Sequence, residues 1–265
     1  MPAQVPAAQR ALRVLALLAA QSEPVTLDHI SRALGVPRSS MYQLVNVMVT
    51  EGFVTHLEDD HRYGLGLAAF EVGSGYTRQA PLQRLARRPL ASLVDDLGES
   101  AHLATLHGAD VIYVLEERAP GKPSLVTDVG IRLPAHLTAS GRAILARLPA
   151  AQVRAQFPAQ SSFVSRTGTG PSSLTALTSL LAATRQRGWA TEDGDVTTGF
   201  ASIAVAVLDA AAHPVAAVAV TYETGSLTND EDAVRRVSDT AAALTRRLRG
   251  RQSGPPPPPN RSSLA

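Results

Sequence analysis

The segment between residues 26 and 66 constrains the fold most, because its start and stop signals define two short helices joined by a tight turn. Thr26 can cap the first helix, and Asp28 in the first turn suits the positive end of the helix dipole. Gly35 can adopt the left-handed conformation that ends this helix. Pro37 can open the second helix, where its missing N–H group costs nothing. We therefore expect a helix-turn-helix unit in this segment.

The second helix of this unit carries two opposite stripes at the same helical spacing. The apolar stripe, which we expect to be buried, consists of Met41, Leu44, Val45 and Met48. The polar stripe consists of Ser39, Tyr42, Gln43 and Asn46. Hydroxyl and amide side chains of this kind bond phosphates and base edges in the major groove of DNA. The polar stripe is therefore a candidate DNA-reading face.

A hairpin is expected directly after this helix. Gly52 can stop the helix, and two short strands at 53–55 and 62–65 flank the polar tip 57–61. An isolated polar stripe is more often merely solvated, but here the caps, the turn and the hairpin follow the order of a winged helix-turn-helix. On that interpretation the contacts with DNA would come from Arg38, Ser39, Ser40, Tyr42, Gln43, Asn46 and Arg62.

Net charge does not by itself indicate a nucleic-acid partner, although the sequence pI is about 9.3. Residues 1–66 hold five basic and six acidic side chains, whereas residues 246–265 hold five arginines and no acid. Phosphate contacts of the N-terminal domain would therefore depend on local groups such as Arg38 and Arg62, on backbone amides and on helix N-termini.

Composition excludes several classes of protein. The 265 residues, 45% of them hydrophobic, suffice for two domains with a sizeable core. Because cysteine is absent, disulfides, thiolate metal sites and thiol nucleophiles are excluded. The sequence has no run of about 18 apolar residues and no apolar secretory signal, so we expect a cytoplasmic protein with no membrane partner. It shows no phosphate loop and no metal-ligand spacing of histidines, so we expect no cofactor and no metal.

The remaining pattern predicts an α+β protein. Helices are expected at 7–20, 67–79, 82–98, 138–147, 174–187 and 230–248. Strands are expected at 102–108, 110–117, 124–129, 202–208 and 214–222. The last two strands are nearly continuous Val, Ala and Ile runs, which indicates the interior of a central antiparallel sheet and resembles a small-molecule sensor domain of the GAF type. The expected parts are a winged helix-turn-helix domain (1–66), a helical linker (67–98), a GAF-like domain (99–249) and a disordered Pro-rich tail (250–265).

Five stretches in this order resemble the IclR-type transcriptional regulators. They are RALRVLALLA (10–19), EGFVTHLEDDHRYGLG (51–66), RLPAHLTASGRAILA (132–146), RGWATEDGDVTTGFASIAVAVLD (187–209) and PVAAVAVTYET (214–224). Each motif is only moderately specific, but their order and spacing extend the resemblance over nearly the whole chain up to about residue 248. The resemblance implies a homodimer, often assembled further into a tetramer, that holds its winged helices on double-stranded operator DNA.

The resemblance also implies that the C-terminal domain binds a small-molecule effector, commonly a carboxylic or aromatic metabolite. Carried over by position, the effector pocket would consist of Leu125, Leu133, Ala139, Ser140, Glu192, Phe200, Ser202, Ala219 and Thr221. Three residues depart from the usual family pattern. Ala219 is less polar and Phe200 is bulkier than usual, which favours a larger or more apolar ligand, and Gln43 replaces a common arginine of the recognition helix.

We therefore predict a ligand-responsive transcriptional regulator, repressor or activator, that is not an enzyme. Two alternatives stay open: a metabolite-binding protein or small-molecule enzyme whose winged helix serves dimerisation, and an architectural DNA binder with a vestigial sensor domain. Glu192 lies near two further acids, Asp193 and Asp195, which could suggest acid–base chemistry or a hard-metal site, but we expect these two in a solvated turn. His102 and His136 are expected to be hydrogen-bonded structural residues.

Overall fold

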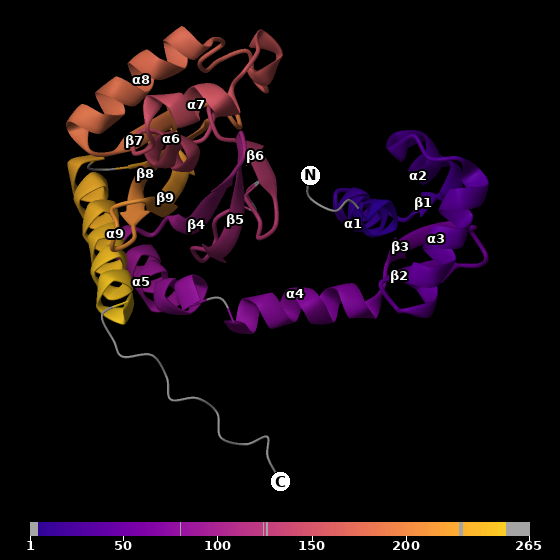
Figure 1. Cartoon of the computed structure of the whole chain (residues 1–265). Coiled ribbons are helices and arrows are strands. Elements are labelled where there is room, and N and C mark those ends of the chain that lie inside the picture. Colours follow the sequence, from indigo (N-terminus) through magenta and orange to yellow (C-terminus); the bar gives the residue numbers. More distant parts are fainter. Residues whose placement is uncertain (1–4, 80, 124, 126, 228–229, 253–265) are drawn as a thin grey trace. The chain divides into compact units, whose positions relative to one another are not determined.

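The computed structural model describes residues 5–79, 81–123, 125, 127–227 and 230–252 (Figure 1). The chain forms two compact units that divide after residue 80. Both contain helices and antiparallel strands, which confirms the predicted α+β class. Among the described residues, no helix is long and apolar enough to cross a membrane.

The N-terminal unit contains the predicted winged helix-turn-helix. Its elements are α1 (Pro6–Ala19), β1 (Val25–Thr26), α2 (Leu27–Leu34), α3 (Arg38–Thr50), β2 (Val54–Leu57), β3 (Arg62–Leu65) and α4 (Leu67–Gln79). Thr26 caps α2, since its hydroxyl accepts a hydrogen bond from the His29 N–H at 3.3 Å, and Gly35 ends α2 with φ of +63°. Pro37 precedes α3 as its N-cap residue with ψ of 141°, so the prediction that it is the first helical residue was off by one position.

The core of this unit is built by the apolar stripe of α3. Met41 and Val45 are fully buried and pack with Val14 of α1 and Ile30 of α2. The wing has three strands in the order β1-β3-β2, one more than predicted, because Val25 pairs with Tyr63.

Gly52 and Gly66 lie in close contact at the two ends of the β2–β3 hairpin. A Cβ atom on Gly66 would lie 2.2 Å from the carbonyl oxygen of Gly52, so no larger residue fits at position 66 without moving the backbone.

The C-terminal unit is a six-stranded sheet with helices on both faces. Its strands are β4 (Ser100–His107), β5 (Asp110–Glu117), β6 (Arg132–Pro134), β7 (Ala190–Asp193), β8 (Phe200–Leu208) and β9 (Pro214–Glu223). Its helices are α5 (Pro81–Leu97), α6 (Ala139–Leu145), α7 (Ala150–Gln156), α8 (Leu174–Arg187) and α9 (Asp230–Gln252), with a short 3-10 turn at Gln160–Ser162. The strand order is β6-β5-β4-β9-β8-β7, every neighbouring pair is antiparallel, and β8 and β9 lie inside the sheet as predicted.

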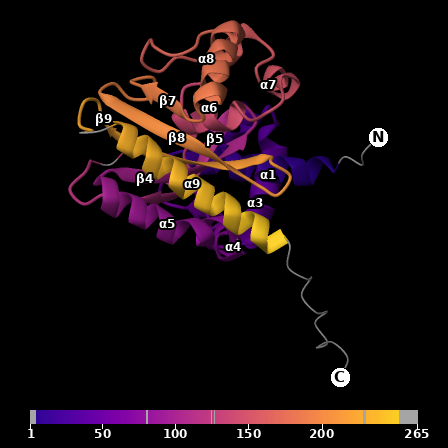
Figure 2. The same ribbon diagram turned by 90° about the vertical axis from the view of Figure 1, so that its left-hand side faces the viewer.

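The two faces of this sheet have different roles. Helices α5 and α9 cover one face, and α6 covers the other, with α7 and α8 outside it (Figure 2). Because side chains alternate along a strand, Val218 and Val220 of β9 pack towards α5 and α9, whereas Ala217 and Ala219 face α6. The small residues on the α6 side leave the space in which a cavity forms.

Some predicted elements differ from the structure. No strand forms at the described residues within 124–129, and the third strand is instead β6, which pairs with β5 through Val111 and Leu133. The strand β7 and the helix α7 were not predicted.

Helix α5 is more than a connector, because Leu90 and Leu93 are buried in the core shared with α9. A linker role for residues 67–98 stays a prediction. Helix α9 continues to Gln252, so residues 250–252, predicted to begin the disordered tail, are helical, and the rest of the predicted tail (253–265) lies outside the described residues.

Candidate functional site

The polar stripe of α3 lies on the surface of the N-terminal unit. Its members Ser39, Tyr42, Gln43 and Asn46, and the adjacent Ser40, are exposed, and 52% of the Tyr42 surface is accessible. The helix contains no acidic residue, so this face offers hydroxyl and amide groups without a charge that would repel phosphate. The burial of the opposite stripe fixes the rotation of α3 about its axis, and thereby presents these side chains outward together.

Arg38 and Arg62, the two arginines predicted to contact DNA, have different partners in the structure. Arg38 forms an ion pair with Asp28 of α2 at 3.0 Å, and both side chains are largely exposed. An exposed pair of this kind contributes little stability, so Arg38 can exchange Asp28 for a phosphate at small cost. The Arg62 guanidinium donates to the Pro24 carbonyl at 2.9 Å and thus ties β3 to the segment before β1. Arg62 therefore has a structural contact that sequence reasoning did not foresee.

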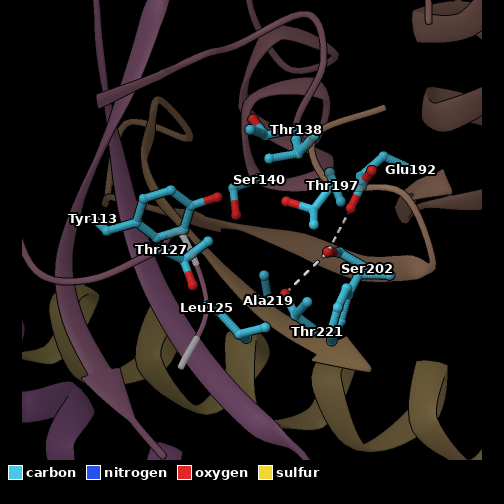
Figure 3. Close-up of a pocket in the computed structure, with 13 residues that line it drawn as sticks. Tyr113, Leu125, Thr127, Thr138, Ser140, Glu192, Thr197, Ser202, Ala219 and Thr221 are labelled. Carbon is cyan, nitrogen blue, oxygen red and sulfur yellow. Dashed lines mark hydrogen bonds between the residues drawn. The ribbon is translucent and has the colours of Figure 1, made fainter. Parts of the chain in front are cut away.

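The C-terminal unit contains a cavity between α6 and the sheet (Figure 3). Its volume is about 70 Å³, several times the roughly 10–15 Å³ that one water molecule requires. Eight of the nine residues expected in an effector pocket line it: Leu125, Ala139, Ser140, Glu192, Phe200, Ser202, Ala219 and Thr221. Five further lining residues were not predicted: Tyr113, Thr127, Thr138, Val196 and Thr197.

Leu133 is the expected pocket residue that the cavity does not include. It lies on β6 opposite Val111 and is buried in a separate apolar cluster with Leu137 and Leu145. Tyr113 could have been found from the alternation of β5, because it points to the same side as Val111. The loop residues Val196 and Thr197 give no comparable periodic signal.

One wall of the cavity is a hydrogen-bonded row across three strands. Glu192 of β7 is paired in register with Ser202 of β8, and Ser202 is paired with Thr221 of β9. The Ser202 hydroxyl donates to Glu192 Oε1 at 2.8 Å and lies 3.0 Å from Thr221 Oγ1. The other carboxylate oxygen of Glu192 accepts from the Asp195 N–H at 3.2 Å. We call this row the Glu192 wall.

The environment of Glu192 favours its neutral form. Burial raises the pKa of Glu192 to about 7, and this effect outweighs the hydrogen bond from Ser202 and the positive charge of Arg142, which both lower it. An acidic group that titrates near neutral pH inside a cavity is typical of binding or catalytic sites, although structural networks also shift pKa values.

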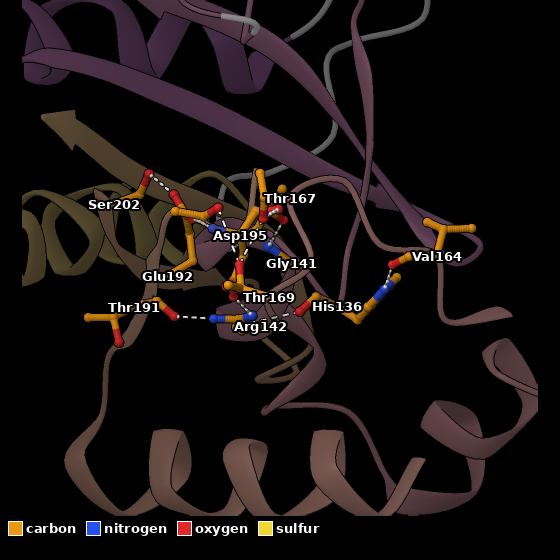
Figure 4. A network of polar contacts seen from close by, with 12 residues as sticks. His136, Gly141, Arg142, Val164, Thr167, Thr169, Thr191, Glu192, Asp195 and Ser202 are labelled. Atoms are coloured by element: carbon orange, nitrogen blue, oxygen red, sulfur yellow. Dashed lines mark hydrogen bonds and ion pairs between the residues drawn. The ribbon is translucent and has the colours of Figure 1, made fainter. Parts of the chain in front are cut away.

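A buried arginine supports the Glu192 wall from behind (Figure 4). Arg142 of α6 donates through Nε to the His136 carbonyl at 2.8 Å and through Nη1 to the Thr191 carbonyl at 2.7 Å. Its third group, Nη2, forms an ion pair with Asp195. The prediction that Asp195 lies in a solvated turn was therefore wrong: Asp195 is buried because its partner Arg142 is buried with it.

The groups across the cavity from the Glu192 wall are hydroxyls. The Ser140 hydroxyl is buried and interacts with the Tyr113 hydroxyl, an interaction that by itself would lower the pKa of Tyr113. Tyr113 lies beside Ser140 (Figure 3), and burial together with the Glu192 charge raises the pKa of the Tyr113 hydroxyl, which keeps its proton. Thr138 caps α6 by accepting from the Gly141 N–H at 3.0 Å.

The buried histidines make structural contacts. The Nε2 atom of His102 lies 3.4 Å from the Thr127 hydroxyl, and burial lowers the pKa of His102 to about 4. The Nε2–H of His136 donates to the Val164 carbonyl at 2.9 Å. Within the described ranges, no group of three or more His, Asp or Glu residues could hold a metal ion.

Comparison with known proteins gives one consistent result. The IclR helix-turn-helix domain model matches residues 7–58, and the model of the C-terminal domain of the bacterial transcriptional regulator IclR matches residues 74–246. The glycerol operon regulatory protein of Streptomyces coelicolor is 30% identical over 252 residues, which cover 94% of this chain and 98% of that protein.

Solved structures show the same fold. An IclR-type transcriptional regulator from Alicyclobacillus acidocaldarius matches with a TM-score of 0.79 at 24% identity, over 92% of this chain and 99% of that one. An IclR homologue from Microbacterium hydrocarbonoxydans, solved in complex with 4-hydroxybenzoate, matches with a TM-score of 0.77 at 22% identity and the same coverage. Both domain models and the relative at 30% identity agree: the chain belongs to the IclR family of bacterial transcriptional regulators.

Proposed function

We propose that this regulator reads its operator with the exposed stripe of α3 and responds to a small organic effector bound in the cavity beneath α6. The observation that carries the first part is the outward face of α3, which offers hydroxyl and amide groups and no acid. The observation that supports effector binding is the cavity beneath α6, which is lined by eight of the nine residues expected in the effector pocket. Regulation follows if effector binding changes the populations of conformations that differ in DNA affinity.

The active form would be a homodimer, alone or assembled into a tetramer, because a helix-turn-helix protein reads two half-sites through a pair of recognition helices. The effector would then act by changing the spacing of these two helices. The Streptomyces relative is named for an operon, the glycerol operon, and we propose by analogy that this chain controls genes for uptake or breakdown of its effector.

A DNA-binding assay tests the role of α3. In a gel-shift titration against DNA flanking its own gene, the double substitution Ser39→Ala/Asn46→Ala should weaken specific binding by roughly tenfold or more, since a good base contact contributes about 1–3 kcal/mol. The control Ser22→Ala removes an exposed hydroxyl outside α3 and should bind like the parent protein. Unchanged sequence selectivity in the double variant would contradict the assignment of α3 as the recognition helix.

An effector assay tests the cavity. Replacing Ser140 with leucine should fill the space beneath α6 and abolish the response of DNA binding to metabolites, while the basal affinity for DNA stays unchanged. Ser140→Ala is the matched control, because it removes the hydroxyl but leaves the space open. A Ser140→Leu protein that still responds to a metabolite like the parent would exclude this cavity as the effector site.

A further inference from the structure

The N-terminal unit has few cations to offer to DNA. Residues 1–66 hold five basic and six acidic side chains. Of the two arginines expected to contact DNA, Arg38 is paired with Asp28, and Arg62 is bonded to the Pro24 carbonyl. Neutralisation of phosphates supplies essentially all of the non-specific affinity of DNA-binding proteins and a large share of their specific affinity. A basic surface elsewhere in the chain would therefore add what this unit lacks.

The helical layer of the C-terminal unit carries such a surface at one of its ends. Helices α5 and α9 lie side by side (Figure 2) and run antiparallel. Asp96 near the end of α5 pairs with Arg236 near the start of α9 at 2.6 Å, whereas Arg247 of the last part of α9 donates to the Leu85 carbonyl in the first half of α5 at 3.3 Å. Five exposed arginines gather at the end where α5 begins, and we call them the α5–α9 basic surface: Arg84, Arg87, Arg88, Arg246 and Arg247.

No acid compensates these five charges. Residues 81–94 and 240–252 contain neither Asp nor Glu, and none of the five arginines forms an ion pair with a described residue. At the other end of the layer, Asp96 pairs with Arg236, and Asp239 lies about one turn along α9 from Arg236. Positive charge is therefore concentrated at the end of the layer where α5 begins.

The stability of α5 does not explain this distribution of charge. The helix has no acid in its first turn and no base in its last turn, where Asp95 and Asp96 lie. The helix dipole favours the reverse arrangement. Arg84, Arg87 and Arg88 also follow the spacing i, i+3 and i+4, so they share one face and repel one another. An arrangement that opposes the stability of its own helix is typical of residues that serve binding.

The rest of this surface suits phosphates better than a protein or a membrane. Protein interfaces have an apolar core, and helices that lie on membranes bury an apolar face. No large hydrophobic side chain is exposed among the described residues of α5 and α9. The groove between these helices is lined, beside Arg88 and Arg247, by the hydroxyl residues Ser92 and Thr240. Arginine and hydroxyl side chains are groups that contact DNA phosphates.

We propose that the α5–α9 basic surface binds phosphates of double-stranded DNA beside the operator, without reading its sequence. The inference rests on the proposed function, because α3 must hold the protein on its operator. Helix α5 begins at Pro81, two positions after the last residue of α4 at Gln79. The end of the C-terminal unit that carries the arginines is thus the end that the chain joins to the winged helix. Contacts with phosphates add affinity and position the protein, but they carry no sequence information.

Salt-dependent DNA binding provides the experiment. Fluorescence anisotropy on the full chain would compare DNA flanking its own gene with a scrambled duplex of the same length, at salt concentrations between about 50 and 200 mM. In Arg84→Gln/Arg87→Gln/Arg88→Gln, the slope of log K against log salt should become shallower by roughly 1 for each arginine that contacts a phosphate. Both duplexes should weaken by the same factor. The Tm of this variant should be no lower than that of the parent, because the three arginines are exposed and unpaired among the described residues.

A matched control tests whether position matters or only net charge. Arg147→Gln/Arg154→Gln/Arg185→Gln removes the same charge from three exposed arginines that follow α6 or lie on α7 and α8. These elements cover the other face of the sheet from α5 and α9. The control variant should keep the salt slope of the parent.

The outcomes separate this inference from the proposed function. A parent-like salt slope in the α5 variant, an equal loss in the control, or a loss confined to the DNA flanking the gene would each overturn the inference. Dissociation of a tetramer in sedimentation, with unchanged DNA binding, would assign the arginines to a contact between copies and overturn it as well. None of these results affects the assignment of α3, which depends on the sequence selectivity of Ser39→Ala/Asn46→Ala. Unchanged selectivity there, with a shallower slope in the α5 variant, would overturn the role of α3 and support the contact with phosphates.

Discussion

Replacing Arg142 with methionine should strongly destabilise the C-terminal unit. The substitution keeps most of the side-chain length but removes the guanidinium, which holds Asp195 and the carbonyls of His136 and Thr191. Only 3% of the Arg142 surface and 7% of the Asp195 surface is accessible. The variant would therefore leave an uncompensated carboxylate and two acceptors in a place that water barely reaches.

The expected magnitude follows from this burial. Removing one partner of a buried ion pair costs about 3–5 kcal/mol in the free energy of unfolding. In a domain of about 150–250 residues, each kcal/mol lowers Tm by roughly 2–4 °C, so a loss of Tm on the order of 6–20 °C is expected. Arg142→Lys should lose less, because it keeps the charge but not the planar fork that reaches three acceptors. Asp195→Asn introduced into the Arg142→Met background should recover part of the stability.

Intrinsic fluorescence gives a selective assay. The chain has one tryptophan, Trp189, which lies in the C-terminal unit under the Arg187 guanidinium, 4.2 Å from the ring centroid. Urea unfolding followed by this fluorophore therefore reports on the unit that contains the ion pair. A loss below about 1 kcal/mol for Arg142→Met, or no recovery in the double variant, would refute the argument that burial of the Arg142–Asp195 pair stabilises this unit.

Three further predictions concern stability. Because the pKa of Glu192 is raised to about 7 in the folded state, the folded protein binds a proton more tightly than the unfolded chain, so the unfolding free energy should fall by up to about 3 kcal/mol between pH 5 and pH 8. Glu192→Gln should remove this pH dependence in the same urea assay. A Cβ atom on Gly141 would lie 2.2 Å from the Ala135 carbonyl oxygen, so Gly141→Ala should cost about 1–3 kcal/mol. In Gly73→Ala, by contrast, the new Cβ atom meets no atom within 4 Å, and this variant should be at least as stable as the parent in thermal unfolding.

The sequence predicted those parts of the fold that depend on local chemistry. The cap at Thr26 and the left-handed Gly35 bound α2 because a hydroxyl and a missing Cβ act on the nearest turn of backbone. Strand β1 escaped prediction because two residues carry no periodicity, and the strand exists only through pairing with the distant Tyr63. Strand β7 is similar, since it is defined by its register with β8.

The residues of the candidate site likewise fall into those that the sequence predicted and those that depend on distant contacts. Most pocket positions could be expected from a resemblance that spans the chain, but the burial of Asp195 could not. Its cause is Arg142, which lies 53 positions away in the sequence, and nothing in the local pattern of Gly194 and Asp195 distinguishes a buried acid from a turn. Leu133 was expected to line the cavity and does not, whereas Tyr113 was not expected and does. The packing of β6 against β5 decides which of these side chains reaches the cavity.

The polarity of the cavity therefore depends on strand register. Glu192, Ser202 and Thr221 form a row only because β7, β8 and β9 pair in this alignment. A slip of one residue would turn a strand's side chains to the other face, where α5 and α9 bury an apolar cluster and a carboxylate would be costly. The same apolar residues that fix the register thus place these three polar side chains beneath α6. Formation of the core and formation of the Glu192 wall therefore depend on the same strand pairing.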